Sequence, residues 1–415
     1  MNKKKELDLD PEIAITDAKP SGTSTFLGSD YPGTRFNLIA DEGTQVKAGE
    51  PVLCDRRHPE IQFTSPISGR VSTVRRGARR SLVSLEITSD GKGDTVEFDI
   101  PTTLNAENIK SLMLRSGLWT SLRSRPFGHL PGPDRSPAAL LITAMDTRPL
   151  APDSAIIINK YINELSAGIK VLCDLVDSPI FVCKAASDEY ELADLHRATV
   201  VEFAGPHPAG LAGIHIQRLC PIGFNGDEVW HIGYQDVISL GHLIHTGKPW
   251  YERVISLAGS SMKNPRLITV PLGASLADIT AQELIEEPSR IFSGSVLSGH
   301  DALDSAGCLR QRDNQVTAML ELTSESADAS NESQTDSLIA TTDLDSLAPS
   351  GILAVPLLRA LLVGDVERAR DLGALELVEE DLALLSHACA SRTDYGRLLR
   401  NILEQIYKEG LSKRN

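Results

Sequence analysis

Three features that many proteins have are missing from this sequence, and each absence excludes a class of protein. The six cysteines are scattered over 415 residues without a CxxC pair, whereas iron–sulfur clusters and structural zinc sites need clustered thiolates. The longest apolar runs, such as 138–145, do not reach the roughly 18 residues that a membrane-spanning helix requires. Basic residues number 41 against 56 acidic ones, a balance that argues against a nucleic-acid-binding protein.

These absences also lead to expectations. Scattered cysteines in a cytosolic chain are expected to be buried as small hydrophobic side chains. No apolar signal core follows the basic start of the chain, so the sequence predicts no secretory leader and a cytoplasmic location. A chain of 415 residues has room for about two to four domains with their own cores. The fold class that we predict is multidomain α/β.

Residues 1–100 are predicted to form a compact all-β domain. Segments 41–53 and 61–71 each combine turns with a strand, and 82–87 alternates apolar and polar residues. These phrases resemble the barrel-sandwich hybrid domain of biotinyl and lipoyl carriers, in which a Lys at a hairpin tip takes the prosthetic group. The corresponding segment 54–58 reads CDRRH and has no Lys. We therefore predict a docking or structural module rather than a swinging arm.

Arginine is dense in this domain although the chain as a whole is acidic. One interpretation is a solvated charged face. The other is a surface that contacts anionic headgroups or an acidic partner protein. The docking candidates are Arg56, Arg57, Arg75, Arg76, Arg79 and Arg80.

Residues 101–252 are predicted to form a Rossmann-like α/β domain. The apolar run 138–145 is typical of a buried parallel strand, and Asp146 stands at its end. Ligands of such sheets bind beyond the carboxyl ends of the strands, so we expect Asp146 to share one rim with the turn 203–216. The other expected elements are strands at 179–183, 198–201 and 229–232 and helices at 105–114, 152–165 and 235–245, with Gly168 placed to end the second helix.

The turn 203–216, FAGPHPAGLAGIHI, contains three glycines, two prolines and two histidines. Glycine permits close approach of a partner, and proline stiffens the turn. Two of the possible amide donors are prolines and no Lys follows, so a phosphate-binding loop fits poorly. The alternatives are a rigid turn that packs one domain against another and a ligand contact.

Three further parts follow. Residues 253–322 have short strands with turns, which suggests a β-grasp domain. Residues 323–350 are rich in Ser, Thr, Asp and Glu, the composition of a mostly disordered polar linker. Residues 351–415 carry several short helical patterns, which predict a C-terminal helical bundle.

Seven sequence segments are specific enough to compare with known families, namely SGLWTSLRSRPF, ITAMDTRPLAPD, EFAGPHPAGLAGIHI, VWHIGYQDVISLG, TGKPWYERVISLAG, RIFSGSVLSG and LLRALLVGD. The match extends from about residue 40 to 299 and again from about 352 onwards. These segments resemble the family formed by the A subunits of the sodium-translocating NADH:quinone reductases. This family is related to the flavin-binding subunit of respiratory complex I and to the C subunit of the Rnf complex.

The resemblance implies a peripheral subunit on the cytoplasmic side of the inner membrane. The complex would be a respiratory-chain translocase that passes electrons from NADH to ubiquinone and transports sodium. The chief partner implied is the B subunit, which is embedded in the membrane and holds quinone and flavin. The alternatives are a flavin-binding electron-transfer subunit like the Rnf C subunit and a pure assembly scaffold.

The resemblance also bears on cofactors. The relatives bind flavin on a glycine-rich loop, but the corresponding segment 117–127 has the bulky Trp119 and Leu122, and the C-terminal part retains only Cys389. We therefore expect no flavin or iron–sulfur cluster on this chain. NADH, FAD, FMN and iron–sulfur clusters would belong to other subunits, with ubiquinone as the substrate of the complex.

Quinone contact is attributed to the A subunit of these reductases, and a quinone headgroup needs an apolar slot with donors to its carbonyls. A packed hinge is the alternative interpretation of segment 117–127. The weak pair His242 and His245 predicts no metal site, and we assign no catalytic residue. The quinone-binding candidates are Trp119, Arg123, Arg125, Phe127, His207 and His215.

Overall fold

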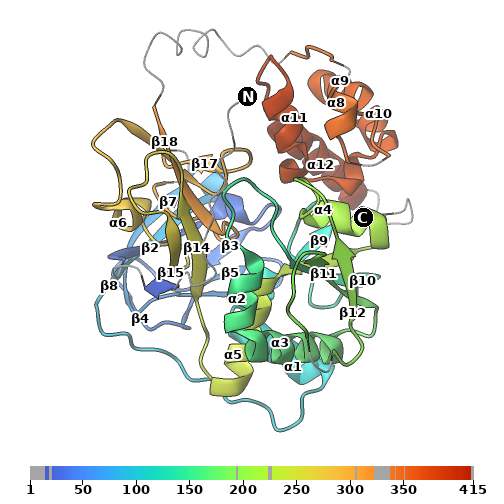
Figure 1. Ribbon diagram of the computed structural model, residues 1–415. Helices are drawn as coiled ribbons and strands as arrows, with labels where there is room; N and C mark the ends of the chain where they lie inside the picture. Colours follow the sequence, from blue (N-terminus) through green and yellow to red (C-terminus); the bar gives the residue numbers. More distant parts are fainter. Residues whose placement is uncertain are drawn as a thin grey trace.

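The computed structural model describes residues 15–17, 21–192, 195–222, 227–303, 306–321, 337–341, 343–349 and 351–412. In these residues the chain forms four sheets and a group of C-terminal helices (Figure 1).

Two small antiparallel sheets form the barrel-sandwich unit, with strand orders β2-β8-β7-β4 and β3-β5-β6. Side chains such as Leu53, Phe63 and Val71 are buried between them, as the alternating pattern predicts. The ring of Tyr31 packs edge-on against Phe63 at 4.8 Å between ring centroids. The strands are β2 (Thr23–Leu27), β3 (Phe36–Leu38), β4 (Gln45–Val46), β5 (Pro51–Asp55), β6 (Gln62–Thr64), β7 (Gly69–Arg76) and β8 (Leu82–Ser89).

A five-stranded sheet of order β12-β11-β10-β13-β9 forms the centre of the α/β unit. Strands β10 to β13 are parallel, and β9 pairs antiparallel with β13. The elements are α1 (Ala106–Arg115), β9 (Arg123–Arg125), β10 (Ala139–Ala144), α2 (Ser154–Lys160), α3 (Ile162–Leu175), β11 (Ile180–Ala185), β12 (Thr199–Phe203), α4 (Ala212–Leu219), β13 (Val229–Gly233) and α5 (Tyr234–Thr246).

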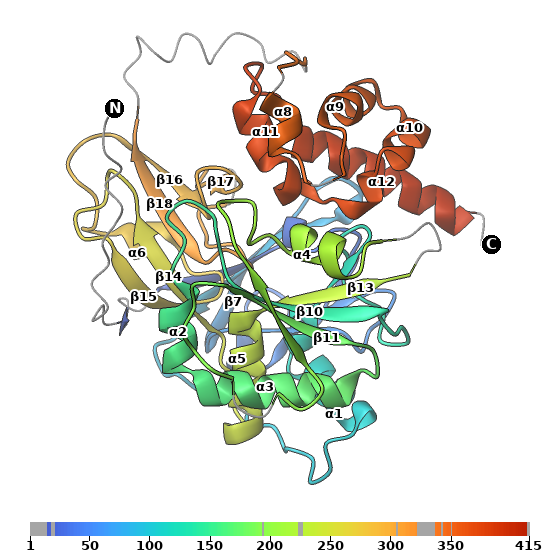
Figure 2. The same ribbon diagram turned by 45° about the vertical axis from the view of Figure 1, so that its right-hand side comes forward.

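Both faces of this sheet are covered, which explains the continuous apolar run of β10. Leu140 and Ile142 belong to the core shared with α3 and α5, whereas Leu141 belongs to a second core with Ile216 of α4. Figure 2 shows α3 and α5 on one face and α4 on the other. The chain leaves β10 toward β11 and returns to β13 on the other side, so the crevice between β10 and β13 is the point where strand order reverses.

The prediction that Gly168 ends a helix is wrong, because Gly168 lies inside α3. A Cβ at Gly168 would lie 2.1 Å from the carbonyl oxygen of Val237 in α5. A Cβ at Gly241 in α5 would in turn lie 1.8 Å from the carbonyl oxygen of Glu164 in α3. The two glycines therefore allow the helices to cross in backbone contact, which outweighs the low helix propensity of glycine.

A mixed six-stranded sheet of order β1-β15-β14-β18-β16-β17 follows in the chain. Its core contains Ile255, Leu257, Ile268 and Val316. Asp278 of α6 accepts hydrogen bonds from the Ser21 hydroxyl and the Gly22 amide and so joins this unit to the barrel-sandwich unit. The elements are β1 (Thr16–Asp17), β14 (Glu252–Ala258), β15 (Arg266–Pro271), α6 (Leu276–Thr280), β16 (Ser289–Ser293), β17 (His300–Asp301) and β18 (Gln315–Leu320).

The helical unit, residues 343–412, has its own core, which includes Leu357, Leu361 and Leu399. The predicted linker 323–350 lies partly outside the described residues. Its described part differs from the prediction, because Asp343–Leu347 forms a helix whose Leu344 is buried in this core. The helices are α8 (Asp343–Leu347), α9 (Ala354–Val363), α10 (Val366–Asp371), α11 (Ala383–Ala388) and α12 (Tyr395–Ser412).

Candidate functional site

A cavity of about 1840 Å³ lies where the four units meet. Its lining includes Tyr31 of the barrel-sandwich unit, Asp146 of the α/β unit, Phe292 of the six-stranded sheet and Glu380 of the helical unit. Fifteen arginines and nine acidic residues line it, although the whole chain has a net charge of −15. The cavity is therefore a locally basic site in an acidic protein.

The inner end of the cavity is the crevice between β10 and β13. Thr143 and Asp146 at the end of β10, and Gly233 and Tyr234 at the end of β13, all line it. The turn 203–216 lies at the same rim, because the Thr147 hydroxyl accepts a hydrogen bond of 2.9 Å from the Gly210 amide. This confirms that Asp146 and the turn lie together.

A chain of ion pairs connects this rim to the helical unit. Arg148 contacts Asp146 at 3.1 Å and Glu380 at 2.5 Å. Burial by itself would raise the pKa of Glu380, but Arg148 and Arg125 lower it to about 2. Glu380 is therefore ionised at neutral pH, and its contact with Arg148 is an ion pair.

A second and deeper ion pair joins the same two units. Arg125 of β9 is fully buried, and its guanidinium donates to the Asp381 carboxylate at 2.9 Å and to the Glu376 carbonyl at 3.0 Å. Asp381 approaches the turn 203–216 so closely that a Cβ at Gly213 would lie 2.3 Å from its Oδ1. The turn 203–216 thus packs the α/β unit against the helical unit, as the first of its two interpretations predicts. Gly210 and Ala212 of the turn also line the cavity.

Of the quinone-binding candidates, only Arg123 and Arg125 line the cavity among the described residues. Arg123 is buried, and its guanidinium lies over the ring of Tyr31 at 4.9 Å from the centroid. It donates to the carbonyls of Thr120, Leu122 and Asp30. Its Nε is buried beside the aromatic ring and has no acceptor in the part of the chain that the structure describes.

Trp119 and Phe127 lie in packed contacts instead. Trp119 is buried edge-on against Trp230 at 5.7 Å, and its Nε1 donates to the Pro131 carbonyl. Phe127 packs on Tyr407 of α12 at 5.2 Å between ring centroids. The contacts of Trp119 agree with the alternative interpretation of segment 117–127, in which this segment is a packed hinge rather than a quinone site. Phe127 contacts the helical unit.

The two histidines of the turn have local partners. His207 lies 3.3 Å from the Thr147 hydroxyl, and burial lowers its pKa. His215 is fully buried, lies against the Phe203 ring at 4.2 Å and contacts the Ala209 carbonyl at 3.0 Å. Burial lowers the pKa of His215 to about 4, so the ring is neutral at physiological pH and stabilises the turn.

The docking candidates divide into two groups. Arg57 donates to the Tyr407 hydroxyl at 3.0 Å, which gives it a structural role between the barrel-sandwich and helical units. The other five have no contact with the helical unit among the hydrogen bonds and ion pairs of the described residues, and all six are exposed. Four of those five line the cavity, namely Arg56, Arg76, Arg79 and Arg80.

Sequence reasoning missed several residues of the site. Tyr31 lies in no sequence motif that indicates a binding site. Asp30 pairs with Arg310 at 2.5 Å, although the two residues are 280 positions apart in the sequence. Asp313 lines the cavity, accepts a hydrogen bond from the Ser293 hydroxyl at 2.6 Å, and has a pKa raised by burial. No local spacing in the sequence signals any of these residues.

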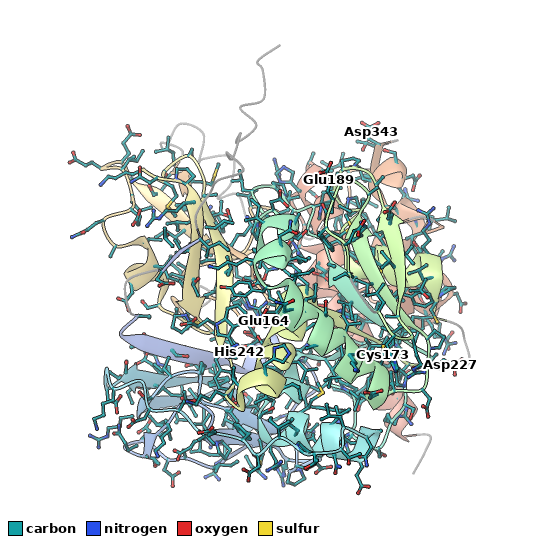
Figure 3. All side chains as sticks on the ribbon, turned by 60° about the horizontal axis from the view of Figure 1, so that its bottom comes forward. Glu164, Cys173, Glu189, Asp227, His242 and Asp343 are labelled. Carbon is teal, nitrogen blue, oxygen red and sulfur yellow. The ribbon has the colours of Figure 1, made fainter. Side chains whose placement is uncertain are left out.

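The described residues contain no group of three or more His, Cys, Asp or Glu side chains that could hold a metal ion. Figure 3 shows His242 of α5 beside Glu164 of α3, and burial lowers the pKa of this histidine. Five of the six cysteines are buried, as predicted, and Cys220 is half-buried. In the same part of the chain, no helix is long and apolar enough to cross a membrane.

Three domain families match the sequence. Residues 3–90 match the NqrA N-terminal barrel-sandwich hybrid domain, residues 104–249 match the NqrA second alpha/beta domain, and residues 254–304 match the NQRA C-terminal domain. The first two matches agree with the barrel-sandwich and α/β units that the structure shows.

Curated relatives match over nearly the whole chain. The A subunit of the Na(+)-translocating NADH-quinone reductase of Pseudomonas aeruginosa (strain UCBPP-PA14) is 38% identical over 96% of this chain and 97% of its own length. The A subunit of Neisseria meningitidis serogroup B has the same values, and that of Mannheimia succiniciproducens is 38% identical over 98% and 99%. A solved NAD+-reducing [NiFe]-hydrogenase is 14% identical, with a TM-score of 0.44, over 73% of this chain and 61% of its own.

Proposed function

Since the chain belongs to the family of A subunits of the Na+-translocating NADH-quinone reductases, we propose that it is a peripheral subunit of such a complex. The complex would pass electrons from NADH to ubiquinone and transport Na+. The single observation that carries this proposal is a match to an A subunit that includes almost the whole length of both chains. The chain would contribute assembly and substrate contact rather than catalysis of its own.

The chief partner proposed is the membrane-embedded B subunit, on the cytoplasmic side of the inner membrane. Exposed apolar side chains at the two ends of α9 are available for such contacts. Leu353, which precedes the helix, and Val363, its last residue, are 60% and 78% exposed. Exposed apolar side chains of this kind are typical of interaction surfaces.

The finer assignment of the units is also a proposal. Four parallel strands with a reversal of order between β10 and β13 support a Rossmann-like domain. The mixed six-stranded sheet with the single turn of α6 supports a β-grasp domain, and the shared core of α8 to α12 supports a helical bundle.

We further propose that NADH, FAD, FMN and iron–sulfur clusters are bound by other subunits. The segment 117–127, where related proteins carry a glycine-rich flavin loop, is filled by the buried Trp119 and Leu122. A Cβ at Gly117 would lie 2.4 Å from the Thr64 hydroxyl, so this glycine allows close packing on the barrel-sandwich unit. These residues do not fit a flavin cradle, which supports the proposal.

Quinone contact is proposed at Tyr31 and Arg123 in the cavity. The Tyr31 ring offers an aromatic surface, Phe36 and Met145 add apolar lining, and the Arg123 Nε is a donor without an acceptor among the described residues. An apolar slot with one or two donors is what a quinone headgroup requires. The arrangement supports contact at this point rather than at Trp119, Phe127, His207 or His215.

The function is tested by co-purification from native cells. An affinity tag on this chain is expected to recover a membrane complex with Na+-dependent NADH:quinone reductase activity. Deletion of the chain is expected to abolish that activity, and the wild-type chain to restore it. The control is the isolated chain, which should be colourless. A tagged chain that recovers no other subunit, or an isolated chain with stoichiometric flavin, would contradict the proposal.

Quinone contact is tested by titrating the full chain with a short-chain ubiquinone and following tryptophan fluorescence. We expect saturable quenching, and Tyr31→Leu should weaken the apparent affinity by up to about tenfold, because aromatic stacking contributes about 0.5–1.5 kcal/mol. Tyr190→Leu is the matched control, since this ring is buried but is not part of the cavity lining. Quenching that never saturates, or that is equal in both variants, would exclude the site.

A further inference from the structure

We propose that the mouth of the cavity docks on a membrane surface that carries anionic phospholipids. The contact would be made by an arginine rim, which we define as Arg35, Arg56, Arg76, Arg79 and Arg80. All five residues are exposed and line the cavity. Arg35 was not among the residues predicted from the sequence.

The rim brings together three separate segments of the barrel-sandwich unit. Arg35 precedes β3 and Arg56 follows β5, and the Arg56 amide donates to the Arg35 carbonyl at 2.6 Å. Arg76 and Arg80 lie on either side of the β7–β8 turn, with 3.4 Å between the Arg76 guanidinium and the Arg80 carbonyl. The folded chain therefore concentrates positive charge that is spread over 46 positions in the sequence.

The charges of the rim have no ion-pair partner in the part of the chain that the structure describes. Among the described residues, no carboxylate lies within 4.0 Å of any of the five guanidinium groups. Two buried arginines of the same cavity are paired, Arg253 with Asp236 at 2.8 Å and Arg310 with Asp30 at 2.5 Å. An acidic protein that gathers arginines at one opening, without a carboxylate beside them among the described residues, has a field there that attracts anions.

The backbone of the turn gives an independent reason to assign a function to these side chains. Arg79 and Arg80 have φ angles of 54° and 60°, the left-handed region in which glycine and asparagine are favoured. Two consecutive arginines are disfavoured at such positions. Strain of this kind is retained where the side chains have a use of their own, and at an exposed turn that use is contact with another surface.

An apolar side chain adjoins the charges. Val83 follows the turn, lines the cavity mouth and is 46% exposed. Arginine pairs with phosphate through two parallel N–H donors, and a basic surface with exposed aliphatic groups suits the headgroup region of an anionic bilayer. Docking in this way would place the cavity opening against the lipid. In that position the opening would also admit a lipophilic quinone from the bilayer. The quinone entry rests on the proposed function, whereas the lipid contact does not.

The test is co-sedimentation of the full chain with vesicles of phosphatidylcholine containing about one-third phosphatidylglycerol, compared with pure phosphatidylcholine. Arg76→Glu combined with Arg80→Glu should weaken binding by about thirtyfold or more, because each arginine near an anionic surface adds a similar share of the affinity. The matched control is Arg368→Glu with Arg370→Glu in α10, where both side chains are exposed and do not line the cavity. Raising the salt concentration should weaken binding in the same direction.

A second variant separates binding from folding. Arg79→Gly with Arg80→Gly removes two charges and also relieves the left-handed backbone, so vesicle binding should fall while the melting temperature stays equal or rises. Equal binding to neutral and anionic vesicles, or unchanged binding by the rim variants, would overturn the inference. If the chain bound isolated partner proteins and not vesicles, the inference would also be overturned. The arginine rim would then be identified as a contact for an acidic protein surface. None of these results depends on quinone binding or on co-purification of the complex.

Discussion

Replacing Arg125 by methionine is expected to destabilise the contact between the α/β and helical units by about 3–5 kcal/mol. The reason is that Arg125 is fully buried and its partner Asp381 is 1% exposed, with 2.9 Å between them. Removing the guanidinium leaves a carboxylate without its counter-charge in a site that water does not reach. The Glu376 carbonyl loses a donor as well.

The measurement is hydrogen exchange of the helical unit in the full chain, because a chain of several units does not unfold in one two-state step. Amides of α11 and α12 should exchange faster in the variant. The double variant Arg125→Met with Asp381→Leu should recover much of the protection, since an apolar pair of similar volume needs no counter-charge.

Arg135→Met is the matched control for this prediction. Arg135 also contacts a carboxylate at 2.9 Å, that of Glu228, but its side chain is 46% exposed. An exposed pair contributes about 1 kcal/mol or less, so exchange should change little. If Arg125→Met and Arg135→Met changed hydrogen exchange equally, the buried pair of Arg125 and Asp381 would not be the contact that joins the α/β and helical units.

Leucine in place of Gly241 is expected to have the second large effect, about 3 kcal/mol or more of destabilisation. The Cβ alone would lie 1.8 Å from the Glu164 carbonyl oxygen, and backbone of α3 cannot rotate away as a side chain could. The helices must therefore separate. Because Tyr234 and Asp236 at the start of α5 line the cavity, the separation should also weaken quinone quenching.

Hydrogen exchange of the α3 and α5 amides in Gly241→Leu, Gly241→Ala and a control glycine variant measures this effect. Alanine should also destabilise, despite its gain of about 1 kcal/mol in helix propensity. The control is Gly410→Ala in α12, which has no neighbour within 4 Å of the new Cβ and should be neutral or slightly stabilising. A Gly241→Ala variant as stable as the wild type would show that the helices do not cross in backbone contact.

The candidate site could be predicted only in part, and its residues show why. Asp146 and the turn 203–216 were placed on one rim because parallel strands bring their carboxyl ends to one edge. Arg123 was expected near a ligand, but its partner Tyr31 is 92 positions away in the sequence. The local sequence predicts a helix end at Gly168, since nothing near this residue in the sequence reveals α5.

By itself the sequence determined the family, the all-β N-terminal domain, the parallel strands and the buried cysteines. These features depend on sequence motifs and periodicities that are a few residues long. Only the tertiary structure decided that Arg125 meets Asp381, that Asp30 meets Arg310, and that five exposed arginines line one cavity. Such contacts join residues tens to hundreds of positions apart. These contacts depend on how the units pack against one another, and a local pattern of side chains in the sequence does not determine that packing.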